Sequence, residues 1–209
     1  MEGVASAFAA TRDGIDSLLR DRGLRKTDPS VTAESLARGA AASGELDGLD
    51  APLPLYAELV ALAPTLASQP LQGFARLHVL AAKGTAPDDE LGRPRDADGA
   101  AALRDIASLI TAPANISTLV VAAIVHAEIV TRAPFASHNG IIARASERAL
   151  LIAKGVDPTS LTVPEAGHLQ LRPQYESNLI GYANGATHAW LLYAAEAFSA
   201  GANASPLSR

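Results

Sequence analysis

Helical periodicity runs through nearly the whole chain, and it limits what the chain can fold into. Apolar residues such as Phe8, Ile15 and Leu19 recur at the spacing of one helix face. Alanine and leucine dominate, while aromatic residues make up only 4% of the chain, so strong helix formers outweigh strand formers. The sequence therefore predicts an all-α fold.

Turn and cap signals divide this pattern into separate helices. Gly23 ends the first, and Asp28 followed by Pro29 is a start signal for the second. Gly155, after Lys154, is the expected C-terminal cap of a later helix. The predicted helices cover about 4–22, 30 to 44–48, 55–68, 71–82, 100–110, 115–131, 139–154, 172–182 and 187–200.

Composition restricts the function classes. The 209 residues suit one domain with a small N-terminal subdomain, and the net charge of −5 argues against a large nucleic-acid interface. The chain has no cysteine, which excludes disulfides and thiolate chemistry and suits a cytoplasmic protein. No basic region followed by an apolar stretch begins the chain, so we expect no signal peptide. The longest apolar run, 119–125, is far too short to span a membrane.

The stretch 133–144 reads as a loop that runs into the start of a helix. Such a start exposes free backbone N–H groups and the positive end of a helix dipole, which suit an anion. Asn139 and Gly140 allow a tight turn and a close approach, and Arg144 lies one turn further on with its guanidinium free to join the same anion. The sequence therefore predicts an anion or nucleotide site at these three residues.

This stretch resembles the signature of the Fic family, His-Pro-Phe-x-Asp/Glu-Gly-Asn-Gly-Arg-x-x-Arg, whose complete form transfers AMP from ATP to a hydroxyl group of a target protein. The resemblance implies an all-α Fic-type bundle, with an N-terminal helical segment over 1–55 and a Fic-like domain over 56–209. The matching residues are Pro134, Phe135, Asn139, Gly140 and Arg144.

The mismatches fall on the chemical positions of the signature. The catalytic histidine falls on Ala133 and the magnesium-holding acid on Ser137. The first loop glycine falls on His138 and the first arginine on Ile141. The resemblance thus implies a degenerate site that has no catalytic residue and no metal ligand. The residues that shape the loop are still present.

Further segments carry the same resemblance, which covers roughly the last two thirds of the chain. Residues 119–130 look like the family's buried central helix, and 161–169 with 175–182 are similar to the segments after the signature in actinobacterial members.

An upstream segment is similar to the family's self-inhibitory motif, Ser/Thr-x-x-x-Glu-Gly/Asn. Ser43, Asp47 and Gly48 match it, with aspartate in place of glutamate. The resemblance implies that Asp47 approaches Arg144. Because aspartate is about one methylene shorter, we expect a long or water-bridged pair.

The region 83–99 is rich in proline, glycine and aspartate. The resemblance implies a flap there, irregular or hairpin, that grips the backbone of a protein target. Composition alone equally allows a solvated surface loop. Arg132, just before the motif, is expected to bind an anion or to form a surface salt bridge with this acidic region.

The other histidines are expected to be structural. His126 and Glu128 lie two positions apart and so point to different faces of one helix. His78, His168 and His188 have no partner at metal-ligand spacing, and Glu147 points away from the anion site. No metal site is therefore expected.

Three functions remain open at this point. The leading one is a Fic protein that is inactive or impaired in AMP transfer and binds ATP or another nucleotide, with magnesium weak or absent. The second is transfer chemistry rebuilt with His138 as a displaced base. The third is a protein-interaction module with an empty pocket. The sequence predicts neither the target protein nor the oligomeric state.

Overall fold

The computed structural model describes residues 2–20, 28–112 and 116–208, and within these ranges the fold is all-α, as predicted. The isolated bridge between Lys83 and Ala86 is the single β feature of the described residues. The helices are α1 (Val4–Arg20), α2 (Pro29–Asp47), α3 (Leu53–Ser68), α4 (Pro70–Ala82), α5 (Ala97–Thr111), α6 (Thr118–Arg132), α7 (Asn139–Ala153), α8 (Pro164–Gln170), α9 (Arg172–Ala183) and α10 (Thr187–Asn203).

Most predicted helices lie within a few residues of the observed ones. The short helix α8 was not predicted, because its seven residues are too few for a helical period to stand out. Gly155 follows α7 in the left-handed conformation, with φ of 74°, as expected for a residue after a helix end. The predicted end of the first helix at Arg22 and Gly23, and a helix start at 115, lie outside the described residues.

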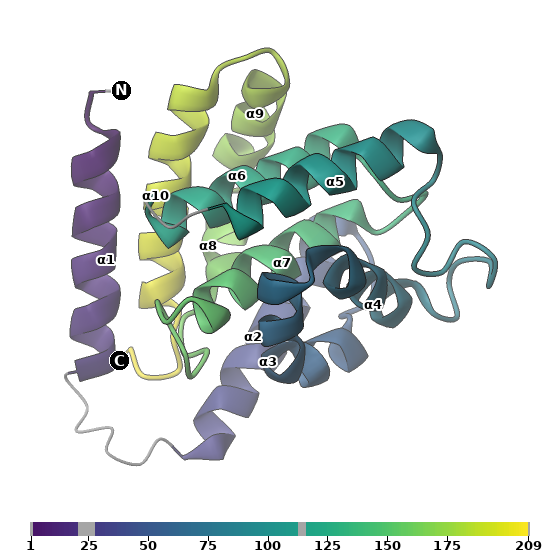
Figure 1. Ribbon diagram of the computed structural model, residues 1–209. Coiled ribbons are helices and arrows are strands. Elements are labelled where there is room, and N and C mark those ends of the chain that lie inside the picture. The colour runs from purple at the N-terminus through teal and green to yellow at the C-terminus, as the bar shows by residue number, and fades with distance from the viewer. Residues whose placement is uncertain (1, 21–27, 113–115, 209) are drawn as a thin grey trace.

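Helix α7 forms the centre of the molecule. Every side chain from Ile141 to Ile152 is buried. Helices α6, α3, α4, α2 and α8 all pack against it, and Figure 1 shows it enclosed by these neighbours. The loop 133–138, called the motif loop below, therefore leads directly into a helix that is buried along most of its length.

Helix α2 begins and ends where its sequence signals indicate. The Asp28 side chain accepts a hydrogen bond from the Ser30 N–H, and Pro29 occupies the first turn. At the other end Gly48 is left-handed, with φ of 66°. Ser43 and Asp47 lie one turn apart at the C-terminal end of α2, and α2 packs against α3, α7 and α8.

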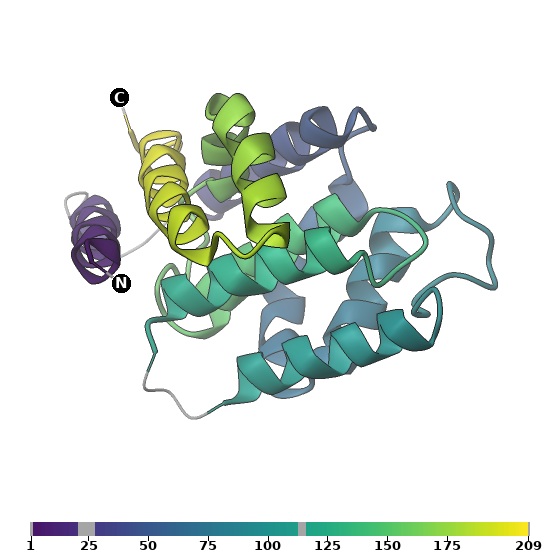
Figure 2. The same cartoon turned by 90° about the horizontal axis from the view of Figure 1, so that it is seen from above.

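The N-terminal helices share the core of the rest of the chain. Val4 and Phe8 of α1 belong to the same buried cluster as Phe198 of α10, and α1 lies beside α10 in both views (Figures 1 and 2). The division at residue 55 stays a prediction. No helix among the described residues is both long and apolar enough to span a bilayer.

The segment between α4 and α5 is irregular, with turns and one isolated bridge in place of a hairpin. In Figures 1 and 2 it projects at the same end of the molecule as the loop between α6 and α7. Two hydrogen bonds described below connect the two.

Candidate functional site

The loop between α6 and α7 is held by its own asparagine. Asn139 Oδ1 accepts from the Phe135 N–H at 3.0 Å, and Asn139 Nδ2 donates to the Phe135 carbonyl at 2.9 Å. The left-handed residues of the loop are Ala133, with φ of 43°, and His138, with φ of 59°. The expectation that Asn139 and Gly140 make the turn is therefore wrong: the turn falls on His138, and Asn139 braces the loop with its amide.

Gly140 is needed for a close approach. A methyl group at this position would lie 2.6 Å from both carboxylate oxygens of Asp47. The Asp47 carboxylate thus lies against the first turn of α7, where an external anion is expected to bind.

Arg144 is buried and fully engaged, so the expectation that its guanidinium is free is wrong. Its side chain is 1% exposed. Nε donates to Ser43 Oγ at 2.9 Å, Nη2 donates to the Ser43 carbonyl at 2.9 Å, and Nη1 donates to the Tyr175 hydroxyl at 3.2 Å. Burial alone would lower the pKa of Arg144, but Tyr175 and Asp47 raise it above its usual value.

The predicted approach of Asp47 to Arg144 is confirmed. Arg144 Nη2 lies 2.7 Å from Asp47 Oδ1, so the expected long or water-bridged pair is wrong. The physical reason is the position of α2, whose last turn lies so close to α7 that the Ser43 carbonyl also reaches the guanidinium. A short side chain is therefore long enough.

The position of Asp47 at the C-terminal end of a helix is locally unfavourable, and tertiary contacts offset this cost. An acid in the last turn of a helix opposes the helix dipole. Arg144 and the first turn of α7 supply positive potential to it, while Arg172 donates to the Glu45 and Leu46 carbonyls of the same helix end. The Asp47 side chain remains 22% exposed, so this acid lies at the rim of the site.

His138 lies beside the same helix start. The Thr85 hydroxyl donates to the Ala82 carbonyl, so His138 Nε2 is the donor in its 3.2 Å contact with Thr85 Oγ1. His138 Nδ1 then accepts from Ser137 Oγ at 2.8 Å. Burial lowers the pKa of His138, against a smaller opposing effect of Asp47. His138 is therefore a neutral imidazole with an adjacent hydroxyl.

Two hydrogen bonds join the segment 83–96 to the loop 133–138, and a third joins the segment to α4. Thr85 contacts His138, the Gly92 N–H donates to His78 Nδ1 at 2.9 Å, and the Arg95 N–H donates to the Pro134 carbonyl at 2.9 Å. The His78 ring stacks on Phe135 with ring centroids 4.4 Å apart. Burial lowers the pKa of His78 to about 4. A buried, neutral histidine thus supports both the loop and the segment.

The remaining predicted positions have structural roles. Ile141 is 1% exposed and belongs to the core. Ala133 caps the C-terminus of α6. Arg132 pairs with Asp105 at 2.9 Å and with Glu128 at 3.4 Å, so the expected salt bridge exists, but its partners are on α5 and α6 and not in the acidic segment.

A second arginine site was not predicted. Arg148, one turn after Arg144, donates to Glu165 Oε2 at 3.0 Å, and all its donor nitrogens are engaged by Glu165, Ser35 and Ser160. Glu165 is fully buried. The one available signal was the pair of arginines four residues apart on an apolar helix. Because buried charges must be paired, two such arginines require acids from elsewhere in the chain.

A buried histidine and glutamate cluster was also missed. His126 is a core residue, as expected, but His168 and Glu147 lie beside it on α8 and α7, and all three are at most 1% exposed. Burial lowers the pKa of His126 to about 4. Burial opposes ionisation of Glu147, yet the facing imidazoles lower its pKa overall. No local spacing could have revealed a cluster drawn from three helices.

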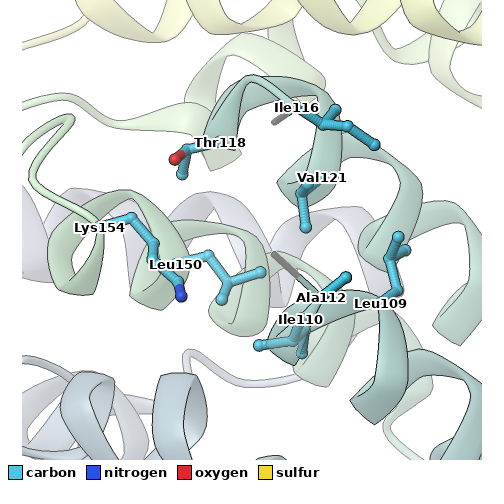
Figure 3. A pocket seen from close by; sticks show the side chains of 8 residues that line it. All are labelled: Leu109, Ile110, Ala112, Ile116, Thr118, Val121, Leu150 and Lys154. Carbon is cyan, nitrogen blue, oxygen red and sulfur yellow. The ribbon is translucent and has the colours of Figure 1, made fainter. Parts of the chain in front are cut away.

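A small apolar cavity lies at the other end of α7. It has a volume of about 60 Å³ and lies between the end of α5, the start of α6 and the end of α7 (Figure 3). Lys154 and Thr118 supply its polar groups among mostly aliphatic neighbours. The cavity is thus remote from the motif loop, which lies at the start of α7.

Comparison with known proteins places the fold. No family profile matches the sequence, and no curated protein matches it. A solved structure of a Fic family protein from Desulfovibrio desulfuricans G20 is similar, with a TM-score of 0.81 and 15% sequence identity over 98% of this chain and 74% of that chain. The chain therefore has the fold of a Fic family protein.

Proposed function

We propose that this chain is a Fic-fold protein impaired in AMP transfer, whose phosphate site is occupied by its own Asp47 and opens to a nucleotide or phosphate when Asp47 moves aside. The observation that supports this most directly is the 2.7 Å pair between Asp47 and Arg144 at the start of α7. An acid there occupies the position and the charge partner that a phosphate would use.

The proposed loss of activity rests on the residues at the chemical positions. Ala133 has no group that accepts a proton, and the Ser137 hydroxyl is a poor magnesium ligand compared with a carboxylate. A general base contributes a factor of about 10² to 10⁴, and charge stabilisation of the transferring group contributes a further factor of about 10² or more. Together these losses leave little AMP transfer, although such factors need not multiply.

One observation favours a second candidate, transfer chemistry based on His138. Its Nδ1 accepts from Ser137 Oγ at 2.8 Å, and a neutral imidazole next to a hydroxyl group is the arrangement of a general base. In this alternative His138 replaces the base missing at Ala133. The segment 83–96 would then be the surface that holds a protein target, in what we expect to be a cytoplasmic protein.

The test measures nucleotide binding and AMP transfer in the same variants. We expect ATP, ADP and inorganic phosphate to bind the wild type weakly and Asp47→Ala more tightly, by about tenfold, the equivalent of about 1.4 kcal/mol. Isothermal titration and the rise of the melting temperature with ligand report this. The matched control is Glu45→Ala, which removes an exposed acid from the same helix turn.

We expect neither the wild type nor Asp47→Ala to transfer labelled AMP from ATP to protein, with or without Mg²⁺. Robust labelling that Asp47→Ala increases and His138→Ala abolishes would replace the proposal of impaired transfer with the His138 mechanism. Equal nucleotide affinity in wild type, Asp47→Ala and Glu45→Ala would contradict the occupied phosphate site.

A further inference from the structure

Three buried side chains from three helices converge in the core, away from the motif loop. His126 comes from α6, Glu147 from α7 and His168 from α8, and their nitrogen and oxygen donor atoms all lie within 4.8 Å of one another. His126 Nδ1 is 3.2 Å from Glu147 Oε2, and His168 Nε2 is 2.9 Å from the same oxygen. We propose that His126 Nδ1, His168 Nε2 and the Glu147 carboxylate bind one divalent transition-metal ion, with Zn²⁺ the best fit.

The unpartnered atoms of the cluster support a missing ligand. Among the described residues, neither His126 Nδ1 nor Glu147 Oε1 has a hydrogen-bond partner, although both are buried. A buried polar atom without a partner has lost its hydration and gained no hydrogen bond in exchange, which is unfavourable. His126 Nδ1 lies close to Glu147 Oε2 without forming a hydrogen bond, at a separation typical of two ligands of one ion, which are roughly 3.3 Å apart for metal bonds of about 2.0–2.1 Å. One ion would satisfy both atoms.

The outer contacts of the histidines have the pattern of a metal site. His126 Nε2 lies 2.9 Å from the Tyr175 hydroxyl, and His168 Nδ1 lies 2.7 Å from the Tyr193 hydroxyl. A metal-binding histidine normally donates its second ring N–H to an acceptor that fixes the ring, and each tyrosine hydroxyl oxygen is placed to accept that bond. Both rings therefore have one nitrogen fixed by a tyrosine and the other directed at Glu147.

The donor set and its charge favour zinc. Two imidazole nitrogens and a carboxylate that binds through both oxygens give four donors, the number a closed zinc site uses. The nearby Arg144 has its charge paired with Asp47, so Glu147 brings a buried negative charge whose contacts are the two imidazoles. A divalent cation balances that charge, whereas Mg²⁺ and Ca²⁺ prefer oxygen-only sites.

The test uses the full chain without a histidine tag. Because the cluster is buried, the protein is unfolded in urea with a chelator and refolded with excess Zn²⁺ or Co²⁺, or with the chelator alone, and then desalted. We expect one metal ion per chain by mass spectrometry, a higher melting temperature in the metal-loaded protein, and visible absorption of Co²⁺ in a tetrahedral site.

Two variants assign the ion. Glu147→Gln, which keeps the shape but removes a carboxylate oxygen, should lose the bound ion and the melting-temperature rise, while His188→Gln, at an exposed histidine, should retain both. Should Glu147→Gln not fold, anomalous scattering at the zinc edge from wild-type crystals decides: a peak among His126, Glu147 and His168 supports the site. Metal-free wild type after refolding with metal, equal melting temperatures, or a peak elsewhere would overturn it and leave a hydrogen-bonded network.

Discussion

Two arginines one turn apart on α7 are both buried, and each pairs with an acid from a different helix. Arg144 pairs with Asp47 from the end of α2, and Arg148 pairs with Glu165 from α8. The Asp47 side chain is 22% exposed, whereas the Glu165 side chain is fully buried. Neighbouring guanidinium groups on one helix thus have one partner at the rim and one in the core.

The surroundings of Arg148 leave no room for an external anion to replace Glu165. Its guanidinium donates to the Ser35 and Ser160 carbonyls as well as to Glu165, and any side chain at Gly39 would clash with Arg148 and Glu165. The comparison teaches that the rigid pair is structural. We expect only the pair with the partly exposed acid, Asp47, to open to a competing anion at a modest cost in free energy.

The largest expected effect separates the two pairs by stability. Glu165→Gln should cost about 3 kcal/mol or more, because it leaves a buried guanidinium without a counter-charge. Asp47→Asn should cost only about 1 kcal/mol, because water reaches the site and Arg144 keeps its bonds to Ser43 and Tyr175. Urea unfolding at pH 7.5 measures both.

The exposed pair of Glu58 with Arg76 provides the control for these two variants. Glu58→Gln should change the free energy of unfolding by less than about 0.5 kcal/mol. Equal costs for Glu165→Gln and Asp47→Asn would show that the two arginine sites are equally locked.

An intermediate effect tests the close packing of Asp47 on Gly140. Gly140→Ala in the wild type should displace the carboxylate and destabilise the protein. In the Asp47→Ala background the same change should be neutral or stabilising, because alanine is favoured over glycine in a helix by about 1 kcal/mol. A double-mutant cycle should therefore give a coupling of about 1–2 kcal/mol. Additive costs would mean that Asp47 does not occupy the helix start in solution.

The smallest effect concerns His78, whose ring stacks on Phe135 of the loop 133–138. Its pKa is about 4 in the folded protein and near 6.5 in its unperturbed form, so the unfolded chain binds more protons between these values and stability falls as the pH is lowered through this range. The loss from pH 7 to pH 5.5 should be about 1 kcal/mol for this group. The variant His78→Asn keeps an acceptor for the Gly92 N–H and should show a shallower pH dependence. Parallel wild-type and variant curves would assign the acid sensitivity elsewhere.

Local signals in the sequence predicted much of the fold. Helix periodicity and low aromatic content indicated an all-α chain, and Asp28, Pro29 and Gly155 marked helix ends correctly. The resemblance of 43–48 to a self-inhibitory motif led to the Asp47–Arg144 pair. These predictions succeeded because caps, turns and helical faces depend on neighbours within one or two turns.

Only the tertiary structure decided what the site residues do. The Arg144 guanidinium donates its hydrogen bonds to Ser43 and Asp47, about a hundred positions earlier in the chain. His126, Glu147 and His168 lie together although they come from three helices. Arg148 likewise finds its acid on the unpredicted helix α8. Helical periodicity says which face of a helix is buried, but the partner of a buried charge is set by which helices pack together, and that is not encoded in local spacing.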